Sequence, residues 1–515
     1  MFNLLKILAQ LNFLSPPNIW HLGRAIRQNG INLPLLFTLA EKRDGNRTAL
    51  VDSRETVSYQ DLQERCGNLA CHLADQYGLG RNQKVAFFCR NHASLVQGIF
   101  AVSRLGADVF LLNNSMSQAQ FDRLVEEHGF DFLIHDDEFS GMIEKSPYRN
   151  PKIFSYHDTE KAISLLAAVP PAAIQKLPPS SSGKIVLLTG GTTGKPKQVV
   201  HKPSLFNFLS PFLALLNRLQ LPKYSTGYIA TPIYHGYGIA VLLSFFALGK
   251  KVVIQDRFDA ESACTLIREH QVEVITAVPL MVHKMLKADK SALGSLACIA
   301  SGGAKLNSAL VEEVNDHLGG VLYNLYGTSE AGLNIIAAPE DLKQHPNTLG
   351  RLIGGGQLRV MKDGKEVEPG ITGEFCFQNK WSMQNSQSRW IQTGDIGWRD
   401  QNGYFFLSGR TDDLIISAGN NIYPLEIEAA LTNHPLVEDA AVIGVDHVYS
   451  GQILTAYVQL RPGEKLTVDA LKEWLRPHLA DFQVPRDIVF VDELPYTAVG
   501  KLDRKRVQKL MPIGA

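Results

Sequence analysis

The sequence predicts an α/β protein with a large N-terminal domain of layered α/β subdomains, a β-rich subdomain and a small α+β C-terminal domain. Three observations support this fold class. Short β-branched runs alternate with helical stretches over residues 34–360, strand-like segments with Asp-Gly and Asn-Gly pairs fill residues 357–408, and about 100 residues follow them. At 515 residues the chain is also too long for one ordinary hydrophobic core.

The first region has the pattern of buried parallel strands connected by helices. Its apolar runs read KVAFFC, ADVFLL, DFLIHD, KIVLL, KKVVIQD, VEVITAV and ACIASGG in chain order. Such runs, rich in Val, Ile and Phe, are typical of strands that are covered on both faces. Residues 58–79 and 115–128 have the length and period of amphipathic helices. We therefore expect a layered α/β architecture here.

The later regions differ in pattern. In residues 357–408, QLRVM, GEFCFQ and GYFFLSG occur with the turn-forming KDGKEVEPG and DQNGY, which predicts an antiparallel subdomain. Beyond residue 410, helical EIEAALTNHP and VDALKEWLRPHL are interleaved with strand-like DAAVIGVD, LTAYVQL and DIVFVDELP. This alternation predicts the small α+β domain.

Composition argues against several classes of protein. Hydrophobic residues make up 45% and charged residues 20%, so we expect an ordered globular chain. The 51 basic residues are balanced by 51 acidic ones, which leaves no global positive field for nucleic acid. The cysteines are scattered without metal-binding spacing, which favours reduced thiols in the cytoplasm. They are Cys66, Cys71, Cys89, Cys264, Cys298 and Cys376.

The N-terminal segment, MFNLLKILAQLNFLSPPNIW, has the pattern of a short amphipathic helix. Lys6, Gln10 and Asn12 interrupt the apolar core that a signal peptide needs, so we expect no export. No window reaches the roughly 20 apolar residues of a membrane span. The pattern leaves open whether the helix packs on its own domain or makes peripheral membrane contact. Its apolar face consists of Leu4, Leu5, Leu8, Leu11 and Phe13.

The stretch TGGTTGKPKQVVHKP, residues 189–203, follows the apolar run KIVLL and has the residues of an anion-binding loop. Its backbone N–H groups, threonine hydroxyls and lysine ammoniums could surround phosphate oxygens. The Walker pattern G-x-x-x-x-G-K-[ST] is absent, because Thr189 stands at its first position and Pro196 at its last. Taken alone, the loop is equally compatible with an ordinary surface loop.

Four further motifs follow in order: YGTSE at 326–330, TGDIGW at 393–398, GRTDDLIISAGNNIYPLEIE at 409–428 and PYTAVGKLDR at 495–504. With the loop they make the chain resemble the adenylate-forming superfamily of acyl-CoA synthetases, adenylation domains and luciferases. The resemblance extends from residue 49 to Lys501. It implies an enzyme that converts a carboxylic acid to acyl-AMP with ATP and transfers the acyl group to coenzyme A, releasing AMP and pyrophosphate.

The resemblance also assigns roles to individual residues. Thr189 and Glu330 would bind Mg²⁺, and with Lys501 they form the expected catalytic set. Asp395 and Arg410 would bind the ribose, and Lys501 would contact the carboxylate and the α-phosphate. Each has a plainer alternative, such as a β-turn start for Asp395 or a surface position for Lys501. The other residues expected to contact ATP or AMP are Gly190, Gly191, Thr192, Thr193, Gly194, Lys195, Lys197, Gly302, Gly303, Ala304, Tyr326, Gly327 and Thr328.

The resemblance implies two domains that rotate against each other between the two half-reactions. The adenylation domain would comprise residues 1–409 and a mobile C-terminal domain residues 413–515, joined by a hinge at 410–412 that includes Asp412. After rotation, Ser417, Ala418 and Gly419 would line a tunnel for the thiol. Asn421 stands where relatives often have a basic residue, so we assign it no phosphate role. A non-catalytic module and an oxygenase are the rival classes.

The acyl substrate is the least determined feature. The segment PIYHGYGIAVLLSFFALG, residues 232–249, would lie beside the acyl pocket, and the chain offers no acidic anchor for an amino acid's ammonium. Its apolar VLLSFF and the N-terminal helix favour a medium- or long-chain fatty acid; an aryl acid and an acyl carrier protein as acceptor are the alternatives. A homodimer is left open. The expected pocket residues are His235, Tyr237, Gly238, Gly327, Ala331 and Gly332.

Overall fold

The computed structural model describes residues 16–158, 161–171, 177–189, 197–201, 209–328, 330–381, 390–417, 420–447, 451–497 and 501–510. The chain separates into two compact units. The first contains the described residues of Met1–Ala277 and Met285–Ile299, and the second those of Val278–Lys284, Ala300–Ser382 and Ser386–Ala515. This division does not follow the expected boundary at residues 409–413, which stays a prediction.

The first unit contains a six-stranded sheet in the order β6-β5-β3-β4-β7-β8. Its strands are parallel except for β8, which is antiparallel to β7. The connections between parallel strands require crossovers, and helices supply them. The strands are β3 (Lys84–Phe88), β4 (Asp108–Leu111), β5 (Phe132–His135), β6 (Lys152–Phe154), β7 (Ile185–Thr189) and β8 (Lys197–His201). The predicted apolar runs in this region are thus confirmed as strands.

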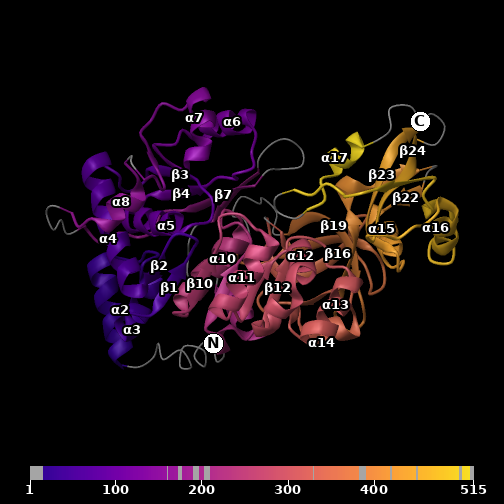
Figure 1. The fold of residues 1–515 in the computed structure, drawn as a ribbon, viewed down its shortest axis with the longest axis horizontal. Helices are drawn as coiled ribbons and strands as arrows, with labels where there is room; N and C mark the ends of the chain where they lie inside the picture. The colour runs from indigo at the N-terminus through magenta and orange to yellow at the C-terminus, as the bar shows by residue number, and fades with distance from the viewer. Residues whose placement is uncertain are drawn as a thin grey trace. The chain divides into compact units, whose positions relative to one another are not determined.

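Two helices of this unit begin at a capping box and end at a left-handed glycine. Helix α4 (Tyr59–Tyr77) starts after a capping box formed by Ser58 and Asp61 and stops at Gly78, whose φ is +64°. Helix α6 (Gln118–His128) follows the same scheme, ending at a left-handed Gly129. Figure 1 shows α4 together with α5 (Ala93–Leu105) and α8 (Ile163–Ala168), and these three helices contact one another.

A second group of strands in the first unit pairs in the order β2-β1-β10-β9-β11. All pairings are parallel except that of β1 with β2. The strands are β1 (Thr48–Val51), β2 (Thr56–Ser58), β9 (Thr226–Ile229), β10 (Lys251–Ile254) and β11 (Val274–Ala277). The helices are α2 (Pro16–Asn29), α3 (Leu35–Asp44), α9 (Leu209–Arg218), α10 (Gly236–Ala247) and α11 (Ala260–His270).

The second unit carries the antiparallel strands predicted for residues 357–408. The strands over residues 322–352, in the region where parallel strands were expected, are also antiparallel, so that expectation is wrong there. The strands after α13 (Ser308–Leu318) are β13 (Leu322–Thr328), β14 (Gly332–Ala337), β15 (Thr348–Leu352), β16 (Gln357–Lys362), β17 (Lys365–Glu366), β18 (Gly373–Gln378), β19 (Ile391–Arg399) and β20 (Phe405–Arg410). Asp363 and Gly364, at φ +49° and +76°, join β16 to β17, as a type I′ Asp-Gly hairpin requires. Ile335, Phe375, Phe377 and Phe405 form much of the core.

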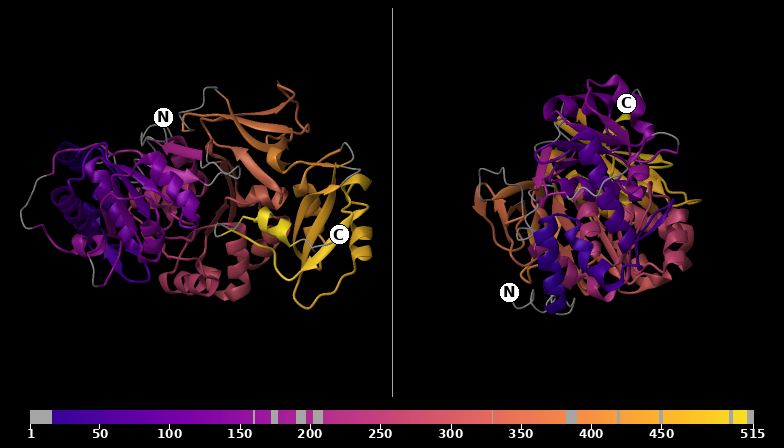
Figure 2. Two further views of the ribbon diagram at one scale, coloured as in Figure 1. Left: turned by 90° about the horizontal axis from the view of Figure 1, so that it is seen from above. Right: turned by 90° about the vertical axis from the view of Figure 1, so that its left-hand side faces the viewer.

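The C-terminal part of this unit has a core and a sheet of its own. The sheet order is β22-β21-β24-β23, and β25 pairs with β24. Figure 2 (left) shows these yellow and light-orange strands as a sheet distinct from β16 and β18. The elements are β21 (Ile415–Ser417), β22 (Asn420–Ile422), α15 (Pro424–Thr432), β23 (Val437–His447), β24 (Gly451–Leu460), α16 (Val468–Leu475), β25 (Asp487–Val491) and α17 (Arg504–Lys509). The predicted α+β pattern is confirmed.

The remaining elements of the chain are few. They include β12 (Cys298–Gly302), α12 (Pro279–Asp289), α14 (Pro339–Gln344) and α7 (Ser140–Lys145). A search of the described helices finds none whose length and hydropathy would allow it to cross a membrane. The predicted N-terminal helix over residues 1–15 lies outside the described residues.

Gly350 in β15 provides a test of this packing. Its φ is +98°, and a Cβ atom there would lie 2.2 Å from the backbone nitrogen of Ala337. Gly364 has a comparable φ of +76° but nothing within 4 Å of such an atom. Both substitutions by alanine should cost about 1–2 kcal/mol for the left-handed backbone, and Gly350→Ala should cost about 1–3 kcal/mol more for the clash.

Thermal denaturation of the two variants measures this difference. Gly350→Ala should lower the midpoint clearly more than Gly364→Ala. Equal shifts would mean that β14 and β15 do not approach each other this closely.

Candidate active site

The centre of the candidate site is the carboxylate of Asp395 in β19. In the antiparallel pairing of β19 with β20, Asp395 lies opposite Arg410. Nη1 of Arg410 donates a hydrogen bond to Oδ1 of Asp395 over 2.6 Å. The hydroxyl of Tyr326, from β13, donates to Oδ2 over 2.6 Å. The Asp395 side chain is 7% exposed and that of Arg410 44%, so the carboxylate is buried while the guanidinium reaches solvent.

The residues before Asp395 fix its direction. The hydroxyl of Thr393 donates to the carbonyl oxygen of Phe375 over 2.9 Å and accepts from the backbone N–H of Asp395 over 3.2 Å. Gly394 has a φ of +72°, which favours glycine, and its N–H donates to Oε1 of Glu374 over 3.0 Å. The alternative that Asp395 starts a β-turn is wrong, because these bonds keep it inside a strand.

Charged groups of both signs act on the carboxylate of Asp395: the cations Arg410 and Lys501 and the anion Glu330. Burial raises the pKa of Asp395, while the hydrogen bond from Tyr326 and the charge of Arg410 oppose the rise. Desolvation lowers the pKa of Lys501, and Arg410 lowers it further. The negative charges of Asp395 and Glu330 act in the other direction and raise the pKa of Lys501. Lys501 as a residue is exposed, and its ammonium interacts electrostatically with Arg410, Asp395 and Glu330. Its catalytic role remains a prediction.

Backbone hydrogen bonds hold the described residues on both sides of Lys501. Its backbone N–H donates to the hydroxyl of Thr497 over 3.2 Å, and the N–H of Thr497 donates to the carbonyl oxygen of Lys501 over 2.8 Å. Tyr496 and Leu502 form an antiparallel bridge beside it. Asp503 then accepts the N–H of Arg506 and so caps α17. These contacts anchor both flanks of the lysine.

Tyr326 has a role that sequence reasoning missed. Its ring packs against Phe375 and Phe377, with ring centroids 6.2 and 6.1 Å away. Burial raises the pKa of Tyr326 well above its ordinary value, so the hydroxyl stays protonated and donates to Asp395. The two residues are 69 positions apart in the chain, and no local signal joins them. The expected contact of Tyr326 with ATP or AMP stays a prediction.

The expected phosphate loop lies in the first unit. Thr189 ends β7, Lys197 begins β8, and the two residues pair across the antiparallel strands. The six loop residues between them that were expected to bind ATP lie outside the described residues. They are Gly190, Gly191, Thr192, Thr193, Gly194 and Lys195. Their roles, and those of Thr189 and Lys197, remain predictions.

The segment SGGAK, residues 301–305, begins within β12 and contains Gly302, Gly303 and Ala304, which were expected to contact ATP or AMP. A Cβ atom at Gly302 would lie 2.8 Å from the carbonyl oxygen of Leu325, and Gly303 has a φ of +81°. Both glycines therefore have a backbone reason to be present. Nζ of Lys305 donates to the carbonyl oxygen of Leu425 over 3.1 Å. This bond joins the segment that includes Ala304 to the start of α15.

On sequence alone, the apolar run VLLSFF supports a fatty-acid pocket. The structure removes this support, because side chains of the run belong to the core of the first unit. In α10, Leu242, Phe245 and Phe246 are at most 1% exposed. The ring of Phe246 packs 5.5 Å from that of Phe100 and 6.0 Å from that of Phe37. Packing within the protein therefore explains why this segment is hydrophobic. Its composition gives no information on the length of an acyl substrate.

The predicted pocket residues of the first unit surround the start of the same helix. His235 immediately precedes α10, and its ring centroid lies 4.4 Å from that of Tyr234. Burial raises the pKa of Tyr237 well above its ordinary value. A Cβ atom at Gly238 would lie 2.3 Å from the carbonyl oxygen of Pro232, so close packing requires this glycine.

The small residues expected in the acyl pocket of the second unit also have packing partners. A Cβ atom at Gly327 would lie 2.5 Å from the carbonyl oxygen of Gly332, and one at Gly332 would lie 2.8 Å from Cδ1 of Trp381. Ala331 is fully buried in the core around Phe375. These contacts explain why the residues are small, and their role toward a substrate remains a prediction.

The expected hinge and tunnel residues follow β20 directly. Asp412 lies in the 3₁₀ turn Thr411–Asp413, with its side chain 59% exposed and Oδ2 3.9 Å from Nη2 of Arg410. Ser417 ends β21, whereas Ala418 and Gly419 lie outside the described residues. Thr328 ends β13.

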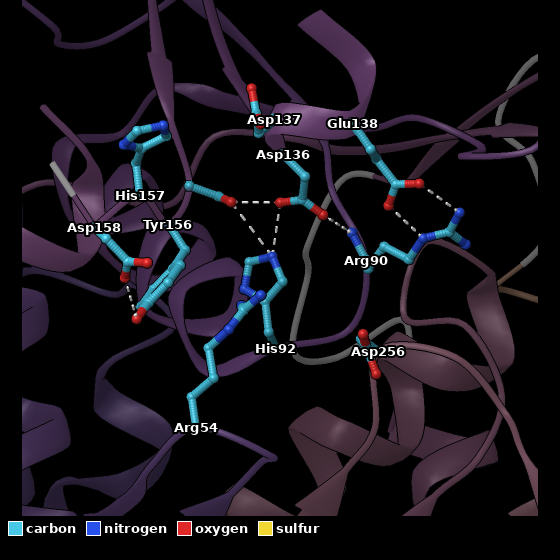
Figure 3. A pocket seen from close by; sticks show the side chains of 11 residues that line it. Arg54, Arg90, His92, Asp136, Asp137, Glu138, Tyr156, His157, Asp158 and Asp256 are labelled. Carbon is cyan, nitrogen blue, oxygen red and sulfur yellow. Dashed lines mark hydrogen bonds and ion pairs between the residues drawn. The ribbon is translucent and has the colours of Figure 1, made fainter. Parts of the chain in front are cut away.

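A separate pocket of about 460 Å³ lies in the first unit, at the carboxyl ends of β3, β5 and β6 (Figure 3). Next to it, Cys89, His92 and Asp136 place their donor atoms within 4.8 Å of one another, as a metal site would. However, Nδ1 of His92 accepts the backbone N–H of Leu95 over 3.0 Å. The ring proton is therefore assigned to Nε2, which donates to Asp136 over 2.8 Å and has no lone pair for a metal.

Ser155 completes this network by donating to the same oxygen of Asp136. Oδ2 of Asp136 accepts the backbone N–H of Arg90 over 2.7 Å. The cluster therefore connects the ends of three parallel strands through one carboxylate, and we assign it a structural role.

Comparison with known proteins identifies the family. The sequence model of the AMP-binding enzyme family matches residues 37–385, and that of the AMP-binding enzyme C-terminal domain matches residues 426–501. The chain is 30% identical over 482 residues to a 2-succinylbenzoate–CoA ligase of Geobacillus sp. (strain WCH70), covering 90% of this chain and 95% of the relative. It is 28% identical over 477 residues to the 2-succinylbenzoate–CoA ligase of Bacillus subtilis (strain 168), with 90% and 95% covered.

Solved structures of similar fold agree with this family assignment. The o-succinylbenzoate CoA synthetase of Bacillus subtilis in complex with the acyl-adenylate intermediate has a TM-score of 0.78 and 26% identity, covering 92% of this chain and 97% of that one. An anthranilate CoA ligase in complex with anthranoyl-AMP has a TM-score of 0.83 at 21% identity, over 93% and 96%, and supports the fold alone. The mixed α/β fold with a large N-terminal and a small C-terminal part is thus confirmed, and the chain belongs to the AMP-binding enzyme family of adenylate-forming proteins.

Proposed function

We propose that this protein is an AMP-forming acid–CoA ligase whose acid is aromatic. The observation that carries the proposal is similarity over 90% of the chain to ligases that act on 2-succinylbenzoate. The fatty-acid expectation has lost its basis, because VLLSFF is core and the similar ligases are named for 2-succinylbenzoate, an aromatic acid. The aryl-acid alternative replaces it.

The reaction would proceed in two displacements. A carboxylate oxygen of the acid attacks the α-phosphorus of ATP, and the bond from that phosphorus to the pyrophosphate oxygen breaks. The thiolate sulfur of coenzyme A then attacks the acyl carbon of the acyl-AMP, and AMP leaves with the electrons of the broken C–O bond. The thiol proton passes to solvent. AMP is the leaving group that the original carboxylate lacked.

The residues around Asp395 suit the first displacement. A carboxylate has about four acceptor positions, so Asp395 can accept a ribose diol while retaining its bonds from Tyr326 and Arg410. Lys501 would stabilise the negative charge that builds on the α-phosphate, an effect of about 3 kcal/mol for one well-placed group. From the family resemblance, Glu330 and Thr189 would each offer an oxygen ligand of the kind that Mg²⁺ prefers, and the ion would offset the charge of the pyrophosphate.

The second displacement would need the thiol to approach from the C-terminal part. We propose that Asp412 acts as the hinge, because it lies in an exposed turn immediately after β20. The segment with Ser417, Ala418 and Gly419 would then line the thiol path. A carrier-protein acceptor, a homodimer and a cytoplasmic location remain predictions.

A substrate panel tests the proposed acid. With ATP, Mg²⁺ and coenzyme A, we expect AMP formation from 2-succinylbenzoate, benzoate or anthranilate, with the best aryl acid exceeding octanoate by at least about ten-fold in kcat/KM. Amino acids should be inert, since no acidic anchor is present in the segment beside the pocket.

Asp395→Ala, purified in parallel, controls for contaminating ligases. Octanoate as the best substrate would restore the fatty-acid hypothesis. Turnover that needs no coenzyme A would instead indicate another class of adenylate-forming enzyme.

The lowered pKa of Lys501 predicts an alkaline limb in the adenylation rate. The charged amine is the active form, so the rate should fall as pH rises through a pKa below the ordinary 10.5. Lys501→Arg should retain partial activity and shift this limb upward, because a guanidinium stays protonated. Lys501→Ala should lose about 10²- to 10³-fold in rate and lack the limb.

Acid-dependent pyrophosphate exchange from pH 7 upward measures these rates. An unchanged limb in Lys501→Ala would assign the titration to another group.

A further inference from the structure

Helix α2 exposes apolar side chains that nothing in the proposed reaction uses. Ile19 is 54% exposed and Trp20 57%, and Ile31, just beyond the helix, is 49% exposed. Within the helix, Ala25 is the buried residue. A soluble surface rarely presents tryptophan and isoleucine side by side without a partner.

The charged side chains that α2 itself carries are basic. Arg24 and Arg27 are exposed on the same helix, and the guanidinium of Arg24 lies 5.4 Å from the ring centroid of Trp20. Residues 16–40 contain no aspartate or glutamate, although the whole chain has 51 acidic and 51 basic residues. Exposed tryptophan and isoleucine next to arginines are the pattern of a helix that lies in the interface of an anionic bilayer.

The orientation of this helix is fixed at its C-terminal end. The backbone N–H of Ser180 donates to the carbonyl oxygen of Asn29 over 3.0 Å, and that of Ser182 donates to Ile31 over 2.9 Å. A Cβ atom at Gly30 would lie 2.3 Å from the carbonyl oxygen of Ser180. Helix α2 also packs beside α3 (Figure 1). The exposed side therefore cannot turn inward without breaking these contacts.

Two arguments select a membrane as the occupant. The helix precedes residue 37, where the match to the AMP-binding enzyme family begins, so the matched fold does not account for its exposed face. The apolar surface comprises three side chains, which is small for a stable protein interface of roughly 1,000 Å² or more. Shallow insertion into a bilayer needs only a few apolar groups with nearby cations. We propose that α2 docks the protein on an anionic lipid surface.

Vesicle sedimentation of the full chain tests this proposal. The protein should pellet with vesicles of phosphatidylglycerol and phosphatidylcholine but not with phosphatidylcholine alone. Each arginine near an anionic surface should contribute about five-fold to the partition coefficient. Arg24→Glu combined with Arg27→Glu should therefore lower it by at least about 25-fold. Ile19→Ala combined with Trp20→Ala should lower it by at least about ten-fold.

Matched controls lie elsewhere on the chain. Phe482 is 49% exposed, and Phe482→Ala should bind vesicles as the unmodified protein does. Arg461→Glu with Lys465→Glu reverses two exposed charges four positions apart and should likewise leave binding unchanged. Far-UV circular dichroism and thermal midpoints verify that every variant is folded.

Equal binding to both vesicle types, or α2 variants that bind like the controls, would overturn the proposal. Loss of a dimer in the α2 variants without any loss of vesicle binding would also overturn it and identify the face as an interface between copies. The test requires no acid substrate, so its outcome is independent of the proposed ligase activity.

Discussion

The buried carboxylate of Asp395 is the constraint on which the candidate site depends. Burying a charge is costly unless it is paired and hydrogen-bonded. Tyr326 and Arg410 satisfy one oxygen each, and both come from strands whose register sets the distances. Without this pairing the pKa of the carboxyl would rise further, because burial raises it and the two partners oppose the rise. The surrounding strands therefore determine the charge of the site as well as its shape.

The same arrangement explains why the site combines four charged groups. Arg410 and Lys501 are cations, and Asp395 and Glu330 are anions, so the group is neutral overall when all are charged. Each anion stabilises the protonated form of Lys501, against the desolvation that lowers its pKa. Lys501 thus titrates below an ordinary lysine, while the two anions favour its charged form. A cation held in this state is suited to meet the charge that develops on a phosphate.

Sequence reasoning predicted the parts of the molecule that depend on local pattern. Strands such as β3, β5 and β11 were predicted because burial on both faces demands unbroken apolar runs. Helix α4 was predicted because residues 58–79 have the length and period of an amphipathic helix. The Tyr326–Asp395 bond could not be predicted, since it depends on the register of strands 69 residues apart. The substrate prediction failed for a related reason. An apolar run has the same sequence pattern whether its side chains line a pocket or pack in the core, as that of Phe246 does.

The most direct measurement of the central claim compares ATP with 2′,3′-dideoxy-ATP in acid-dependent pyrophosphate exchange. If Asp395 accepts the ribose hydroxyls, wild-type kcat/KM should fall for the dideoxy analogue by about 10- to 100-fold, as expected for hydrogen bonds to a charged group. Tyr326→Phe should weaken this discrimination, and Asp395→Ala should abolish it in whatever exchange activity remains. Equal use of both nucleotides by the unmodified protein, or unchanged discrimination in Asp395→Ala, would contradict the account.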